Sequence, residues 1–267
     1  MNKKVVTQFT LLTFGIMIIT WGVCVVCGRF EIILEKHFWL YIPYIIGAFS
    51  PTIASYAVLK KNNEINGIKE WIKTVFAFKN SIWFYLLVIV LSLTYFVPQI
   101  IINGLQNTQP FYLFFILLPV VLVGGGMEEA GWRYILQPEL DKKFGHIFTA
   151  IIVAVIWSAW HIPLYFIPGI EQYGGNFWLF ALDVLGLSFA LGAIRKISNN
   201  VFLCVLFHCI HNAGSVTFNI PDTLYANSIS TGITIMLSII MVVIYNVSTR
   251  FKNKKVNPKS LQREKSY

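Results

Sequence analysis

The feature that most constrains this chain is a series of apolar runs, each about as long as a lipid bilayer is thick. A helix that crosses a bilayer needs roughly 20 predominantly apolar residues. The chain has 267 residues and 56% of them are hydrophobic, which is typical of a polytopic membrane protein and unlike an ordinary soluble domain. We therefore predict an all-α fold of eight transmembrane helices, at residues 5–27, 39–59, 81–101, 111–136, 147–168, 177–195, 201–219 and 229–247.

The apolar runs follow one another with short connections, and no internal repeat is visible among them. This pattern predicts a single membrane domain over residues 1–247, followed by a basic cytoplasmic tail at residues 248–267. The first run follows Lys3 and Lys4 and exceeds the length of a signal-peptide core. No small-x-small cleavage site follows it, so we expect it to remain as the first helix.

The distribution of basic residues predicts the topology. If the N-terminus is cytoplasmic and the helices alternate, 18 of the 21 lysine and arginine residues fall on the cytoplasmic side. Only Arg29 and Lys36 fall on the opposite side, and Arg133 lies within the membrane. This asymmetry follows the positive-inside rule and predicts a multi-pass protein of the cell membrane with both termini in the cytoplasm.

The same distribution explains the net charge of +9, so the charge does not indicate a nucleic-acid partner. The expected partners are the lipid bilayer and a membrane-associated substrate. Residues 62–79 mix polar and aromatic side chains, a composition that suits an amphipathic helix on the cytoplasmic face.

Three charged residues interrupt the fourth apolar run, in the stretch Gly124-Gly125-Gly126-Met127-Glu128-Glu129-Ala130-Gly131-Trp132-Arg133. A charge in the middle of a membrane costs about 2.5–3.5 kcal/mol on insertion scales, so such groups are expected to be paired or functional. Glu129 and Arg133 are four residues apart, share a helix face and can form an ion pair. Glu128 has no equivalent partner, which leaves it available for chemistry.

Two further polar clusters lie in later apolar runs. One is Trp157-Ser158-Ala159-Trp160-His161-Ile162-Pro163, and the other is Phe207-His208-Cys209-Ile210-His211-Asn212. His208 and Asn212 are four residues apart and share a helix face. A carboxylate, imidazoles and an amide on three helices are expected to face the bundle interior. Such a set suits a hydrolase, because it offers groups to activate water and donors to hold an oxyanion.

Taken together, the three motifs resemble those of the CPBP family, the CAAX prenyl protease and bacteriocin-processing (Abi) group of intramembrane endopeptidases. The resemblance covers about residues 111–219 and rests on Glu128-Glu129-x-x-x-Arg133, Trp157-x-x-x-His161 and His208-x-x-x-Asn212. The family's second motif usually begins with Phe, and Trp157 holds that place here.

The resemblance implies an eight-helix fold and cleavage of a peptide bond within or near the membrane. It implies that Glu128 and His161 activate water and that His208 and Asn212 stabilise the oxyanion. Glu129 and Arg133 would form a structural or substrate-orienting pair.

The family is often described as metalloproteases, and a metal-free glutamate mechanism is also argued for its eukaryotic-type members. Glu128, His161 and His208 could supply the His₂Glu ligands of an open catalytic zinc site. The chain has no H-E-x-x-H sequence, the usual helix-borne zinc signature, so the cofactor stays open and a metal-free mechanism is favoured.

Other functions remain compatible with the sequence. Membrane carboxylates and imidazoles also build the proton relays of proton- or ion-coupled transporters, although the inverted repeat typical of transporters is not visible here. A non-catalytic immunity scaffold with the same fold is a third reading. The Ile-, Asn- and Lys-rich composition favours a bacterial role in peptide or bacteriocin processing, or in self-immunity. The substrate's identity and any contribution of His211 or Asp183 stay open.

Overall fold

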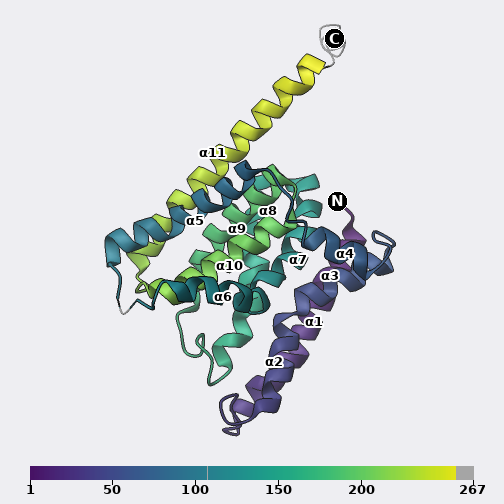
Figure 1. Ribbon diagram of the computed structural model, residues 1–267. Helices are drawn as coiled ribbons and strands as arrows, with labels where there is room; N and C mark the ends of the chain where they lie inside the picture. Colours follow the sequence, from purple (N-terminus) through teal and green to yellow (C-terminus); the bar gives the residue numbers. More distant parts are fainter. Residues whose placement is uncertain (107, 257–267) are drawn as a thin grey trace.

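The structure is a computed structural model that describes residues 1–106 and 108–256, and the described chain is entirely helical. This confirms the predicted all-α class (Figure 1). The longer helices are α1 (Lys3–Gly28), α2 (Tyr41–Ala48), α3 (Ser50–Lys61), α4 (Ile68–Val75), α5 (Ile82–Asn103), α6 (Tyr112–Val123), α8 (Gln137–His161), α9 (Phe177–Ser198), α10 (Val201–Phe218) and α11 (Leu224–Val256). Residues 257–267 of the predicted basic tail lie outside the described residues, and α11 continues through the tail's first residues to Val256.

Six helical stretches of the described chain are long and apolar enough to cross a membrane. A seventh is obtained if residues 38–48 and Ser50–Lys61, which bend by 50° at Phe49, count as one crossing. The chain is therefore a multi-pass helical protein, but the predicted number of eight separate transmembrane helices is not confirmed.

One difference arises in the helix predicted at 111–136. Helix α6 has only 12 residues, because the backbone turns at Gly125, where φ is +153° and a side chain would be strained. The next helical stretch, from Gly126 to Phe166, is interrupted at Gly145, whose φ of +71° and ψ of 174° are not helical, and the chain turns back there so that Trp157 reaches Glu128 (2.7 Å). The stretch is thus two helices, divided where the sequence predicted a connection. It comprises a 3₁₀ turn (Gly126–Glu128), α7 (Glu129–Gly131), a π-helical turn (Trp132–Leu136), α8 and a second 3₁₀ turn (Ile162–Phe166).

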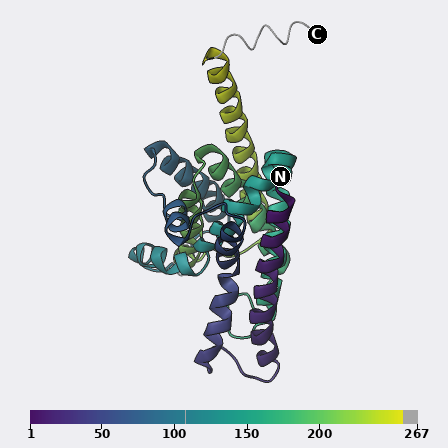
Figure 2. The same ribbon diagram turned by 90° about the vertical axis from the view of Figure 1, so that its right-hand side faces the viewer.

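The start of α1 lies toward the end of the bundle from which the last turns of α11 project, as both views show (Figures 1 and 2). Hydrogen bonds and one ion pair join the segments at this end, which we call the terminal end. They connect Asn2 to Glu139 (2.6 Å), Gln8 to Asn62 (2.7 Å), Lys196 to Asp141 (3.9 Å), and Asn200 to Ala77 (2.8 Å).

The other end of the bundle, which we call the loop end, holds the connections α1–α2, α5–α6, α8–α9 and α10–α11. Here Gly28 packs directly against Pro168, and Gly169 lies beside Glu35. The amide of Gln109 donates to the carbonyl of Thr217 (2.9 Å), and the Asn103 side chain donates to the carbonyl of Pro221 (2.7 Å).

The core between the two ends is rich in tryptophan. Trp132 packs edge-on against Phe9 and Trp160, and Trp160 also packs against Trp21. Indole rings of this size contribute about 0.5–1.5 kcal/mol per aromatic contact beyond their buried area. The core fixes α1 against the stretch that carries the charged motif.

The segment predicted to be amphipathic contains α4. Trp71 and Val75 on this helix are buried, and the Trp71 indole donates to Ser55 of α3 (2.9 Å). Ile68 and Ile72 are exposed beside Lys69 and Lys73. The helix therefore has the amphipathic pattern predicted for residues 62–79.

Candidate active site

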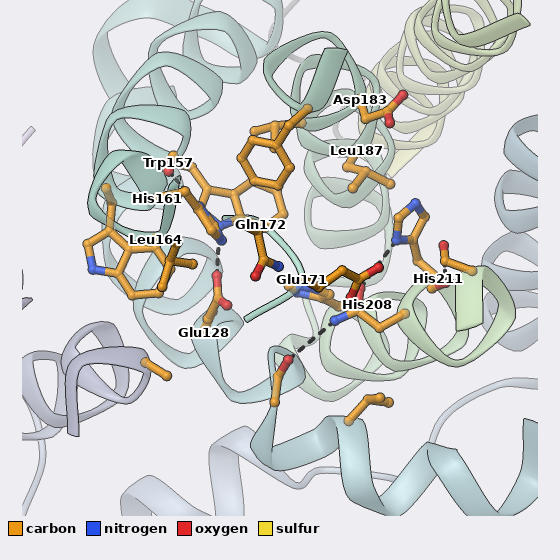
Figure 3. Close-up of a pocket in the computed structure, with 18 of the residues that line it drawn as sticks. Glu128, Trp157, His161, Leu164, Glu171, Gln172, Asp183, Leu187, His208 and His211 are labelled. Carbon is orange, nitrogen blue, oxygen red and sulfur yellow. Dashed lines mark hydrogen bonds between the residues drawn. The ribbon is translucent and has the colours of Figure 1, made fainter. Parts of the chain in front are cut away.

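The three sequence motifs meet at one cavity of about 390 Å³. Glu128 from the 3₁₀ turn, His161 from the end of α8, and His208 and Asn212 from α10 all line it. Figure 3 shows Glu128 on one side of the cavity and His211 on the other. The four side chains therefore converge on one chamber, as the sequence predicted.

Two tryptophan indoles hold the carboxylate of Glu128. Its Oε2 atom accepts from Nε1 of Trp157 at 2.7 Å and from Nε1 of Trp132 at 3.4 Å. Glu128 is 7% exposed and has no Lys or Arg within ion-pair distance among the described residues. It is thus a buried carboxylate that is fixed by neutral donors, with its second oxygen left without a described hydrogen-bond partner.

Trp157 also orients the first histidine. The backbone carbonyl of Trp157 lies 2.9 Å from Nδ1 of His161, so Nδ1 carries a proton, and Nε2 is unprotonated when the ring is neutral. Nε2 of the same ring is then an acceptor. The ring is held between Trp160 and Phe180, at centroid distances of 4.6 and 4.7 Å.

A chain of polar contacts runs from Arg133 to His208 through Glu129. Nε of Arg133 lies 2.9 Å from Oε2 of Glu129, and both side chains are fully buried. The other carboxylate oxygen, Oε1, lies 2.9 Å from Nδ1 of His208. Glu129 therefore fixes the imidazole of His208, whose Nε2 is directed away from it.

Further polar groups support Arg133 from the opposite side. Its Nη1 donates to Gln137 Oε1 at 3.2 Å and lies 3.5 Å from both oxygen atoms of Ser188. The guanidinium also lies 5.6 Å from the ring centre of Trp157, in cation–π range. The ion pair predicted from the i, i+4 spacing is present, within a network that also contains Gln137 and Ser188.

The glycine run allows α10 to approach the motif closely. A Cβ atom on Gly125 would lie 2.4 Å from Nδ2 of Asn212 and 3.1 Å from Nε2 of His208. A Cβ atom on Gly126 would lie 2.5 Å from the Cys209 sulfur. The side-chain nitrogens Nδ2 of Asn212 and Nε2 of His208 therefore point at the same backbone position, three residues before Glu128.

Two residues left open by the sequence also line the cavity. His211 Nδ1 lies 3.3 Å from Asn212 Oδ1, and its ring packs against Tyr95 and Phe96. Asp183 accepts from Tyr95 (3.3 Å) and Asn227 (3.2 Å). These contacts hold His211 and Asp183 against α5 and α11, on the opposite side of the cavity from Glu128 (Figure 3).

Sequence reasoning missed the polar roles of Trp132, Trp157, Gln137 and Ser188. For Trp157 a signal existed, because it heads the second motif and is four residues before His161. Gln137 and Ser188 gave no signal, since a lone Gln at a helix start and a lone Ser in an apolar helix are common.

The geometry bears on the predicted zinc ligands Glu128, His161 and His208. His161 and His208 each have one ring nitrogen bonded to a protein acceptor and the other free, as ligating histidines do. However, within residues 1–106 and 108–256 no three His, Cys, Asp or Glu side chains gather closely enough to hold a metal ion. Glu128, His161 and His208 are not assembled as a ligand set, and zinc enters no step proposed below.

Comparison with known proteins agrees with the motifs. Residues 110–214 match the family described as type II CAAX prenyl endopeptidase Rce1-like. The chain is also 27% identical over 189 residues to CAAX prenyl protease 2 of Methanococcus maripaludis. The aligned residues make up 62% of this chain and 68% of that protein. The family match includes Glu128, Glu129, Arg133, His161, His208 and Asn212, so the resemblance indicated by the three motifs is confirmed.

Proposed function

We propose that the chain is an intramembrane protease of the Rce1-like, CPBP type, and that it hydrolyses a peptide bond of a membrane-associated protein or peptide at Glu128. The observation that carries the proposal is the meeting of Glu128, His161, His208 and Asn212 at one cavity within an apolar bundle. These groups are costly to bury separately, and one hydrated chamber serves all of them.

Glu128 and His161 are the residues assigned to water activation. The carboxylate of Glu128 has one oxygen held by two indoles and the other without a described partner, so it can accept a proton from a water molecule. Nε2 of His161 is an acceptor on the same cavity and can hold the second hydrogen of that water. After attack, Glu128 delivers the proton to the leaving amine.

His208 and Asn212 are the residues assigned to the oxyanion. Nε2 of His208 and Nδ2 of Asn212 point at one place beside Gly125, which supports their acting on a single oxygen atom. Nδ1 of His208 donates to the Glu129 carboxylate, and this negative charge stabilises a doubly protonated His208 ring, the form that can also donate from Nε2. Preorganised donors of this kind stabilise a developing oxyanion without reorganisation.

The substrate class proposed is a peptide that reaches the chamber as an extended strand. The relative in Methanococcus maripaludis is named as a CAAX prenyl protease, so a prenylated C-terminal peptide is one candidate. An unprenylated leader peptide, processed in bacteriocin maturation or self-immunity, is the other and the one we favour from composition. Parallel assays with both peptide types distinguish them.

The proposal is tested by peptide hydrolysis with purified protein in detergent. Glu128→Gln keeps the shape of the side chain but removes the base, so turnover should be lost. Asn212→Ala should slow turnover by about 10²–10³, the usual effect of one lost oxyanion donor. Glu64→Gln, at an exposed residue near the terminal end, is the matched control and should retain wild-type turnover.

The outcome also separates the alternatives. Full hydrolysis by Glu128→Gln contradicts the proposed base. Absence of hydrolysis by the wild type, together with Glu128-dependent uptake of ions in proteoliposomes, would identify a transporter. Absence of both activities would leave the non-catalytic scaffold.

A further inference from the structure

The two ends of the bundle differ in charge. At the terminal end the described basic residues far outnumber the acidic ones. They are Lys3, Lys4, Lys60, Lys61, Lys69, Lys73, Lys79, Lys142, Lys143, Arg195, Lys196 and Arg250, against Glu64, Glu70, Glu139 and Asp141. At the loop end the described charges are Arg29 and Lys36 against Glu31, Glu35, Glu171 and Asp222. Because basic residues are retained in the cytoplasm, the terminal end is the cytoplasmic one.

The chamber lies toward the loop end. Its lining includes Glu171 and Gln172 from the connection α8–α9, and Ser215 and Val216 from the last turn of α10. These residues are close in sequence to Pro168, Gly169 and Thr217, whose contacts define the loop end. Glu171 is exposed, so the lining reaches the surface there.

The opposite side of the chamber is closed by packed side chains. Glu129, Trp132, Arg133 and Leu136 follow Glu128 toward the terminal end, and each is fully buried. Gln137, one turn beyond Arg133, is 1% exposed and donates to the carbonyl of Gly192. A peptide that came from the cytoplasmic face would have to displace the Glu129–Arg133 pair and the tryptophan core before it reached Glu128.

We propose that the chamber opens on the non-cytoplasmic side of the membrane, and that the segment it receives is a peptide displayed on that side. The location of the opening rests on the charge distribution and the packing. Only the statement that the received segment is cleaved rests on the proposed function. The substrate is thus a peptide that has already crossed the membrane, or the outer part of a membrane-anchored one, rather than a cytoplasmic C-terminus.

Cysteine labelling in intact cells tests the location without any need for activity. Glu171→Cys and Lys143→Cys are introduced separately into a chain in which Cys24, Cys27, Cys204 and Cys209 are replaced by Ala. Both positions are exposed, Glu171 at the chamber and Lys143 at the terminal end. If the cysteine-free chain does not fold, the three buried cysteines are kept and only half-buried Cys27 is replaced.

A membrane-impermeant maleimide should label Glu171→Cys in intact cells and Lys143→Cys only after permeabilisation. The reverse pattern overturns the proposal, as does labelling of both or of neither position in intact cells when both label after permeabilisation.

The peptide substrates described above are then added to membrane vesicles of either orientation. Hydrolysis only in right-side-out vesicles supports the proposal, and hydrolysis only in inverted vesicles overturns it. If the labelling is as predicted but vesicles of neither orientation hydrolyse a peptide, the proposed function is rejected. The chamber would still be shown to open on the non-cytoplasmic side.

Discussion

At the scale of single residues, Trp157 connects the two groups proposed to activate water. Its indole N–H donates to the Glu128 carboxylate, and its carbonyl accepts from His161. The family motif usually has Phe at this position, and a phenyl ring has no N–H to donate. In this chain the tryptophan therefore supplies a hydrogen bond that fixes the Glu128 carboxylate.

Trp157→Phe should lower kcat while leaving KM close to that of the wild type. A hydrogen bond to a charged group contributes about 1.5–3 kcal/mol, which corresponds to a 10- to 150-fold loss. Trp132→Phe is the matched comparison, because its indole lies 3.4 Å from the same oxygen and should matter less. Steady-state kinetics on both variants provide the measurement, and a larger loss for Trp132→Phe would contradict this account.

The buried ion pair leads to a second prediction at this scale. Arg133→Ala removes the cation from a fully buried ion pair and leaves His208 as the remaining partner of Glu129, which should destabilise the fold by about 3–5 kcal/mol. Lys142→Ala breaks the exposed Glu139–Lys142 pair and should change stability by no more than about 1 kcal/mol. Thermal unfolding in detergent compares the two variants. Equal unfolding temperatures would show that Arg133 does not stabilise the bundle through this pair.

At the scale of elements, the break between α6 and α7 allows α10 to lie against the motif. The backbone at Gly125 has a positive φ, and the side chains of Asn212 and His208 occupy the space where a Cβ atom would be. The break ends α6 after 12 residues and turns the chain so that Glu128 faces the cavity. A sequence pattern of apolar residues alone would have continued the helix.

Gly125→Ala should therefore reduce both folded yield and turnover, because the methyl group would displace the Asn212 amide and strain the backbone. Gly22→Ala is the control: Gly22 lies within α1 and has no atom within 4 Å of the added methyl group. Alanine there should be neutral or slightly stabilising. Size-exclusion profiles and hydrolysis assays measure both effects, and a fully active Gly125→Ala protein would refute the close packing.

At the scale of the whole molecule, contacts gather the segments predicted to be cytoplasmic at one end of the bundle, and the side of the membrane that this end faces stays a prediction. Reporter fusions at residue 260 and within the α5–α6 connection at Leu105 should report opposite sides of the membrane. The fusion at residue 260 should be cytoplasmic, because the positive charge at the terminal end is retained there. A reporter at residue 260 found outside the cell would reverse the assigned orientation and, with it, the side on which the chamber opens.

The sequence by itself determined the helical class, the membrane setting, the three motifs and the Glu129–Arg133 pair. These features depend on local properties: the length of an apolar run, the spacing of residues on a helix, and the penalty for a charge in lipid. The family resemblance followed from the same local patterns, because its motifs are short and ordered.

Only the tertiary structure decided how the apolar runs are divided into helices and what surrounds each polar side chain. The predicted span at 111–136 is broken at Gly125, whereas the division between the spans predicted at 111–136 and 147–168 is present at Gly145, where the backbone is not helical. The partners of Glu128 and His208 come from residues 29 and 79 positions away, through the indole of Trp157 and the carboxylate of Glu129. Contacts between residues so far apart depend on how helices pack, which no local pattern in a single sequence specifies.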